Sequence, residues 1–250
     1  AEPSEFPEIG GAVITVEPPA SSAVDQRRSF VMLVGALAGG NLVASVLRMI
    51  GGIIQANLVS PAVLGLFNGL GLVVGYAPWG QLGILNGLNR ELPYWIGKGK
   101  REHVNELAAA GQAWAFALSG VLGVGVLTVA ACYLFHGDFE LAAGYASNAF
   151  LIFFLFYGTQ YLQFTYRTSS DFARLAMINV AQNAVAMALL VFVLWFSFYG
   201  LCLRAVLAGA VFTVMLHYWR PIPVGPKWNW SHLKHLLLRR NSFSRLGNRK

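Results

Sequence analysis

The sequence predicts an all-α, polytopic membrane protein built as a bundle of six transmembrane helices. Hydrophobic residues make up 56% of the 250 residues and charged residues only 12%, whereas roughly a quarter of a soluble domain is charged. Uncharged apolar stretches recur along the chain, and a spanning helix needs about 20 mostly apolar residues. Because hydrocarbon offers no water to the backbone amides, each stretch is expected to be helical.

The apolar stretches place six helices along the chain. The expected spans are residues 29–55, 62–86, 106–135, 141–166, 175–196 and 202–219. Turn or polar segments separate them, at 57–61, 90–102, 136–138, 167–174 and 199–200. Three prolines, Pro221, Pro223 and Pro226, are expected to end the last helix, because proline lacks the amide hydrogen that a helix interior requires.

The spans divide the chain into three parts. Residues 1–28 combine glutamates with prolines and lack the apolar core of a signal peptide, so we expect a disordered cytoplasmic lead-in. Residues 29–220 form the six-helix transmembrane lobe. Residues 221–250 form a basic cytoplasmic tail, whose last part is polar and adds no further span.

The positive charges of the connections predict the orientation. Lysine and arginine precede the first helix, occur in alternate connections and follow the last helix, while Asp138 and Glu140 are the only charges of the other connections. Short cytoplasmic loops of membrane proteins collect lysine and arginine. We therefore expect an even number of helices with both termini in the cytoplasm. The same rule explains the net charge of +7 without nucleic acid, for which no basic amphipathic face is present.

Five charged residues are candidate substrate-binding groups: Arg48, Arg90, Glu91, Arg167 and Arg204. Arg48 and Arg204 fall inside spans, where a charge costs roughly 2.5–3.5 kcal/mol on insertion scales and is expected to face protein or water. They could line a path for an anionic diphosphate or acidic sugar, although Arg204 could instead extend to the interface. The other three lie at cytoplasmic helix ends, where they either receive head groups or only set the topology.

The second expected helix is unusually rich in glycine and amide side chains, with Gln81 and Asn86 among them. Such a composition is typical of a helix that lines a cavity. Close helix packing also requires small residues, so the sequence leaves both interpretations open.

The sequence contains no motif that is typical of a catalytic site. No nucleophile–base pair, paired carboxylate or phosphate-binding glycine loop occurs, so we predict no catalytic residue and no cofactor. Cys132 and Cys202 lie in apolar segments, where cysteine acts as a small hydrophobic residue. The histidines are scattered, and the pair His232 and His235 in the tail is not interpreted as a metal site.

Three segments are distinctive: IQANLVSPAVLGLFNG at 54–69, GILNGLNRELPYWIGKGKREHVNELAAAG at 83–111 and KWNWSHLKHLL at 227–237. They resemble segments of polysaccharide flippases of the multidrug/oligosaccharidyl-lipid/polysaccharide exporter superfamily. The first is similar to the family's first inter-helix hairpin and the second to its second connection. The third looks like the basic elbow that follows the first lobe, so the similarity covers residues 29–238.

The resemblance implies one lobe, the N-terminal one, of a transporter whose two six-helix lobes enclose a cationic cavity. By alternating access such a protein flips an undecaprenyl-diphosphate-linked oligosaccharide for surface polysaccharide or lipopolysaccharide biosynthesis in the bacterial inner (plasma) membrane. The implied partners are the lipid-linked oligosaccharide, membrane lipids and either a second transporter lobe or a glycan polymerase. The tail 239–250 resembles nothing in the family, so we interpret 221–250 as a truncated elbow.

Two other functions stay open. A drug or small-solute exporter of the same superfamily would share the fold, and only the resemblance of the basic loop favours the sugar branch. An intramembrane glycosyl or acyl transferase would need clustered acidic or histidine side chains at one membrane face. The acidic residues near the spans are few and scattered: Glu91, Glu106, Asp138, Glu140 and Asp171. We therefore predict that the chain is not an enzyme.

Overall fold

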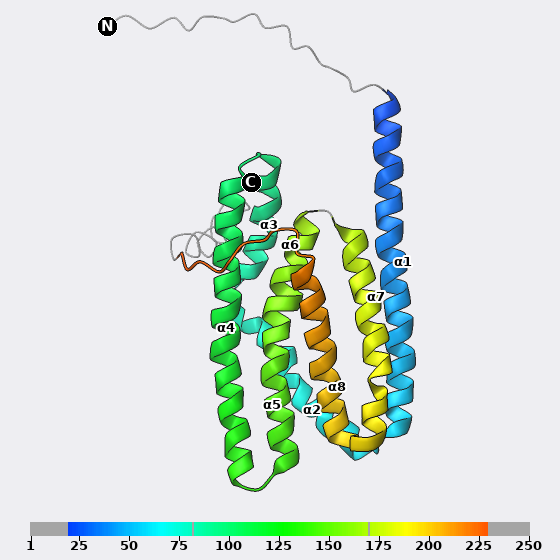
Figure 1. The fold of residues 1–250 in the computed structure, drawn as a ribbon, viewed down its shortest axis with the longest axis vertical. Helices are drawn as coiled ribbons and strands as arrows, with labels where there is room; N and C mark the ends of the chain where they lie inside the picture. Colours follow the sequence, from blue (N-terminus) through cyan, green and yellow to red (C-terminus); the bar gives the residue numbers. More distant parts are fainter. Residues whose placement is uncertain (1–19, 82, 170, 230–250) are drawn as a thin grey trace, which may run out of the picture.

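The computed structural model describes residues 20–81, 83–169 and 171–229, and helices form most of this part of the chain (Figure 1). The elements in chain order are α1 (Ala20–Leu58), α2 (Pro61–Tyr76), the 3₁₀ helix η1 (Ala77–Gln81), α3 (Ile84–Gly97), α4 (Arg101–Phe135), α5 (Phe139–Phe153), the π-helix η2 (Phe154–Leu162), α6 (Gln163–Thr168), α7 (Phe172–Ala188) and α8 (Leu190–Tyr218). The expected lead-in 1–28 thus overlaps the start of α1, while residues 1–19 and 230–250 lie outside the described residues.

The described residues confirm a multi-pass, all-helical membrane protein. They contain no strand, and five helical segments are long and apolar enough to cross a membrane. These segments are Ala38–Leu58, Pro61–Gln81, Arg101–Phe135, Phe139–Thr168 and Leu190–Tyr218. The predicted count of six is therefore not exact. The difference is α7, whose 17 residues extend only about 26 Å, short of the roughly 30 Å of hydrocarbon in a bilayer.

The charged connections are sorted between the two ends of the bundle. The start of α1, the α3–α4 and α6–α7 connections and the end of α8 lie at the upper end in Figure 1, and the other turns lie at the lower end. The upper connections contain Lys98, Lys100 and Arg101, whereas the α4–α5 turn contains Asp138 and leads into Glu140. We call these the basic end and the acidic end. Their assignment to the two sides of a membrane stays a prediction.

The second expected helix is broken into three pieces. α2 gives way to η1 at Ala77, where Pro78 has no amide hydrogen for a continuous helix. Gly83 then adopts φ 81° just before α3, a left-handed conformation that glycine reaches without a steric penalty. α3 continues to Gly97 through part of the expected polar loop, because Leu88 and Leu92 bury one of its faces.

The bend before the last long helix lies earlier than expected. α7 ends at Ala188, and α8 is kinked at Ser197, with φ 46° and ψ −112°. Residues 190–196 cross the acidic end before α8 rises through the bundle (Figure 1). At the bend a Cβ added to Gly200 would lie 2.7 Å from the Cα of Val193. The chain can fold back this closely only because residue 200 has no side chain.

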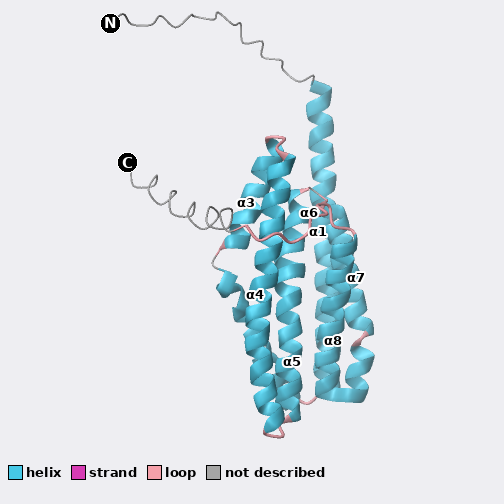
Figure 2. Ribbon diagram, turned by 60° about the vertical axis from the view of Figure 1, so that its left-hand side comes forward, coloured by secondary structure: helices cyan, strands magenta, loops and turns pink. Residues whose placement is uncertain are grey.

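Two groups of helices meet along α8. α1 packs on α7 and α8, while α5 and η2 contact α8 from the other group, in which α4 packs on α5 and η2 (Figure 2). The largest core joins α3, α4, η2, α6 and α8 through residues such as Leu88, Phe156 and Leu216. Because lipid tails are as apolar as leucine, close packing rather than escape from water stabilises this core. Gly111 illustrates the packing, since an added Cβ would lie 2.5 Å from Leu88 Cδ2.

Candidate functional site

A group of polar side chains lies inside the bundle near its basic end, where α4, η2 and α8 meet. The hydroxyl of Tyr157 on η2 lies 2.5 Å from Nδ1 of His217 on α8. It also accepts a hydrogen bond from Nε2 of Gln112 on α4, at 3.5 Å. We call these three residues the polar cluster. Such bonds between helices are expected at membrane depth, because hydrocarbon offers polar side chains no other partner.

The π-helix η2 positions Tyr157 in this cluster. Its nine residues interrupt the helical segment that begins as α5 and ends as α6. π-helices are rare and occur frequently at functional sites. Directly after Tyr157, a Cβ added to Gly158 would lie 2.5 Å from Oγ1 of Thr213, one turn before His217 on α8. η2 therefore approaches α8 closely at the point where Tyr157 meets His217.

Two buried polar atoms, one within the cluster and one beside it, have no hydrogen-bond partner within the described part of the chain. They are Oε1 of Gln112 and Oγ1 of Thr213. The side chains are only 2% and 5% exposed. A buried polar atom without a partner costs roughly 1–3 kcal/mol. The cluster thus has hydrogen-bonding capacity that its present arrangement does not use.

Aromatic and basic groups surround the cluster. Phe116 of α4 stacks on the Tyr157 ring, with ring centroids 4.6 Å apart. Tyr161 also stacks on the Tyr157 ring, with ring centroids 5.9 Å apart. The guanidinium of Arg220 interacts with both Tyr157 and His217, and its Nη1 donates to the carbonyl of Val224 at 3.0 Å. The buried side chains of Tyr157 and Gln112 are thus connected by hydrogen bonds to the imidazole of His217, which is exposed at the basic end.

Three of the five residues predicted to bind substrate lie at the basic end. Arg90 and Glu91 are on α3 and each has an interaction partner, and Arg167 is on α6, which contacts α3. Nη2 of Arg167 lies 3.5 Å from Oε1 of Gln163, and its guanidinium lies 5.9 Å from the ring centre of Phe164. Their role in binding stays a prediction.

Arg48 lies in the middle of the span Ala38–Leu58, with its side chain exposed. Ala44 is buried on a neighbouring stripe of α1, whereas Asn41 and Ser45 are exposed. Residues 41, 45 and 48 share one helix face, because residues three and four apart are neighbours on a helix. We call them the polar row. Across the described residues, no hydrogen bond or ion pair engages Arg48.

Arg204 is half-buried where α1, α7 and α8 meet. Its Nε donates to the carbonyl of Ala186 at 2.7 Å, and its Nη1 donates to Oε1 of Gln55 on α1. Ala186 lies in the last turn of α7, where carbonyls lack helical partners and carry partial negative charge. Arg204 therefore caps α7 and joins three helices, and a Cβ added to Gly51, one turn after Arg48 on α1, would lie 3.8 Å from the Arg204 Nη2.

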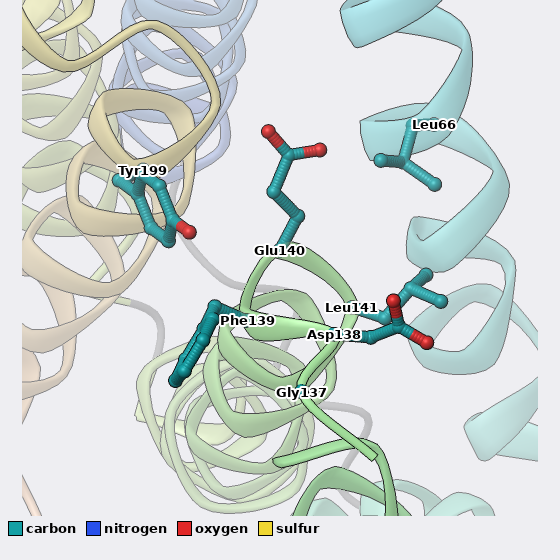
Figure 3. A pocket seen from close by; sticks show the side chains of 7 residues that line it. All are labelled: Leu66, Gly137, Asp138, Phe139, Glu140, Leu141 and Tyr199. Atoms are coloured by element: carbon teal, nitrogen blue, oxygen red, sulfur yellow. The ribbon is translucent and has the colours of Figure 1, made fainter.

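A cavity of about 490 Å³ opens at the acidic end (Figure 3). It is lined by Leu66 of α2, residues 137–138 of the α4–α5 turn, residues 139–141 of α5 and Tyr199 of α8. The carboxylate of Glu140 extends between Leu66 and Tyr199, and that of Asp138 lies on the Leu66 side. Across the described residues no three His, Cys, Asp or Glu side chains are placed to hold a metal ion. None of the five predicted binding residues lines this cavity.

Comparisons with protein-family models, with curated proteins and with solved structures found no match to this chain. The chain's own residues therefore carry the functional argument, beside the resemblance of its three sequence segments.

No sequence pattern singles out the polar cluster. Gln112 gave the only usable signal, an amide within the uncharged stretch 107–135, where it is expected to need a partner. His217 counted as one of five scattered histidines. Tyr157 gave no signal, because apolar periodicity does not reveal where a helix widens into a π-helix.

Proposed function

We propose that the chain is a transporter lobe that translocates a lipid-linked oligosaccharide across a bacterial plasma membrane, with the basic end in the cytoplasm. The polar row on α1 is the observation that carries this proposal. It sets the exposed side chain of Arg48 at mid-span, on a face beside the stripe of α1 on which Ala44 and Gly51 are buried. A charge facing hydrocarbon costs about 2.5–3.5 kcal/mol. That face is therefore expected to meet water, protein or an anionic substrate rather than lipid tails.

The chemistry of Arg48 suits the diphosphate of a lipid-linked sugar. A guanidinium is always charged and binds phosphate oxygens through two parallel N–H donors. A diphosphate carries its charge at the junction between a lipid tail and a polar glycan, so an arginine at membrane depth favours its passage. The resemblance to polysaccharide flippases supports the same substrate class.

The glycines of α2 add a second argument. A Cβ added to Gly65, Gly69, Gly71 or Gly75 would meet no heavy atom within 4 Å. These small residues are therefore not used for close packing against the described helices, and Asn68 among them is exposed. Small and polar faces on α1 and α2 are typical of helices that line a substrate path between two parts of a transporter.

The test is a flipping assay with the purified chain in proteoliposomes. A polyprenyl-diphosphate oligosaccharide with a fluorescent sugar is placed in both leaflets, and an added glycosidase that cannot cross the membrane reports the outward arrival of the inner pool. We expect the chain to speed this arrival. Arg48→Ala is expected to slow it roughly 10- to 100-fold, because a charge-assisted contact with phosphate is lost.

Arg101→Gln is the matched control, since it removes an arginine from the exposed start of α4 and is expected to leave flipping unchanged. Equal arrival with and without the chain would refute the proposal. Transport of a cationic dye in place of the glycan would favour the exporter alternative. A covalently altered lipid donor would favour the transferase alternative.

A further inference from the structure

We propose that the polar cluster is a proton-binding site, in which protonation of His217 reverses its hydrogen bond with Tyr157 and turns the side-chain amide of Gln112. The ligand is a proton that enters from the basic end. This switch uses only contacts within the chain, so it does not depend on whether the chain transports a glycan.

The three side chains form a route from the surface to the interior. His217 is exposed at the end of α8, while Tyr157 and Gln112 are 5% and 2% exposed. The route crosses from α8 to η2 and then to α4. Histidine is the side chain whose ordinary charge change falls between pH 5 and 8. A proton taken up at the surface therefore acts directly on a buried hydroxyl.

The described arrangement corresponds to neutral His217. Nε2 of Gln112 donates to the Tyr157 oxygen, so the phenol directs its own hydrogen to Nδ1 of His217, 2.5 Å away. Nδ1 then acts as the acceptor, and the imidazole hydrogen sits on the outer nitrogen. These roles follow from satisfying the network as a whole. Oε1 of Gln112 is left without a donor.

Protonation of His217 makes this arrangement impossible. Both imidazole nitrogens then carry hydrogen, so Nδ1 must donate to the Tyr157 oxygen. The phenol hydrogen needs a new acceptor, and the unpaired Oε1 belongs to the amide that already faces it. A half-turn of that amide brings Oε1 to the hydroxyl. Each arrangement has two hydrogen bonds and one unpaired amide atom, so the proton alone selects between them.

The switch acts where η2 has little room to adjust. A Cβ on Gly158 would lie 2.5 Å from Thr213 Oγ1, and one on Gly209 would lie 2.7 Å from the ring of Phe154. η2 and α8 therefore touch through two glycines just below the Tyr157–His217 bond. A change in that bond is expected to alter the hydrogen bonding of the π-helix itself, since close-packed interfaces transmit strain.

The charged and titratable groups that face His217 come from three elements. η2 provides Tyr157 and Tyr161, and the segment after α8 provides Arg220. α6 provides Tyr166, whose hydroxyl donates to the carbonyl of Leu216 at 3.1 Å, and which interacts with Asp171 and Arg174 of the α6–α7 connection and α7. α4 faces the cluster with the neutral amide of Gln112.

The first test follows the side chains of the full chain in lipid nanodiscs by NMR between pH 5 and 8.5. Ring-labelled histidine reports the titration of His217, which is assigned by its absence in His217→Gln. Labelled glutamine reports the side-chain amide of Gln112, assigned with Gln112→Leu. We expect the Gln112 signal to shift with the same midpoint as the His217 ring, and to stop following pH in Tyr157→Phe. A Gln112 amide that ignores the His217 titration would overturn the proposal.

The second test measures hydrogen exchange of the η2 backbone, corrected for the pH dependence of the chemistry. We expect exchange in η2 to change roughly threefold or more across the His217 titration, as a local opening equilibrium would. The pH dependence of η2 exchange should vanish in His217→Gln. It should persist in His136→Gln, which alters a histidine hydrogen-bonded to the backbone carbonyl of Cys132 at the acidic end. If the pH dependence persisted in His217→Gln, another group would cause it, and the proposed role of His217 would be refuted. The comparison of the His217 and Gln112 midpoints in the wild-type chain remains a test even if a variant folds poorly.

Discussion

Replacing Gly200 with alanine is expected to destabilise the folded chain by about 3 kcal/mol or more, the upper end of overpacking costs. The added Cβ would lie 2.7 Å from Val193 Cα and from the carbonyl carbon of Phe192. These are backbone atoms, so no side-chain rotation can relieve the overlap. The bend between residues 190–196 and the rest of α8 would have to open. Thermal unfolding in detergent, followed by circular dichroism, measures the loss.

Gly125→Ala provides the matched control on α4. A Cβ there would meet nothing within 4 Å, and alanine is favoured over glycine in a helix by about 1 kcal/mol. The control is therefore expected to unfold at the wild-type temperature or slightly above it. If the two variants unfolded at the same temperature, the close approach at Gly200 would not be a determinant of the fold.

Replacing Gln55 with leucine is expected to destabilise the chain by about 1.5–3 kcal/mol, the cost of removing a hydrogen bond to a charged group. The half-buried guanidinium of Arg204 would keep its bond to Ala186 but lose its partner on α1. A charge inside a span with fewer partners is unfavourable. Unfolding by a denaturing detergent, titrated into micelles of a mild one, measures the difference.

The double variant Gln55→Leu, Arg204→Met separates this explanation from simple loss of packing. Removing the charge together with its partner also removes the cost of an uncompensated buried charge. The double variant should therefore be more stable than the sum of the two single changes predicts, by about 1 kcal/mol or more. Strictly additive effects would mean that Arg204 and Gln55 do not stabilise one another.

The class of fold could be predicted because uncharged runs and alternating basic connections reflect the bilayer directly. The breaks within helices could not. The stretch 49–89 contains no charge, so its hydropathy does not predict that α2 ends at Tyr76, just before Pro78. The sequence predicts a turn at Gly200, whereas Ser197 takes the positive φ and Gly200 is required by close approach of the backbone.

The candidate site was less predictable than the fold because its contacts join distant parts of the chain. Arg204 could be recognised as a charge within a span, but its bonds to Gln55 and Ala186 depend on three helices meeting. Tyr157 and His217 lie 60 positions apart in the sequence. No local pattern relates them, and the π-helix that aligns them has no apolar signature.

The length of α4 has a mechanical consequence. Its 35 residues extend about 52 Å, some 20 Å more than the hydrocarbon of a bilayer is thick. The helix therefore reaches out of the lipid as a rigid strut, and α3 braces it there with Leu88 and Leu92. Just before α4 begins, Lys98 at the end of α3 lies against the rings of Tyr94 and Trp95. A small tilt of α4 within the membrane would therefore move this end of the helix sideways through the aqueous space.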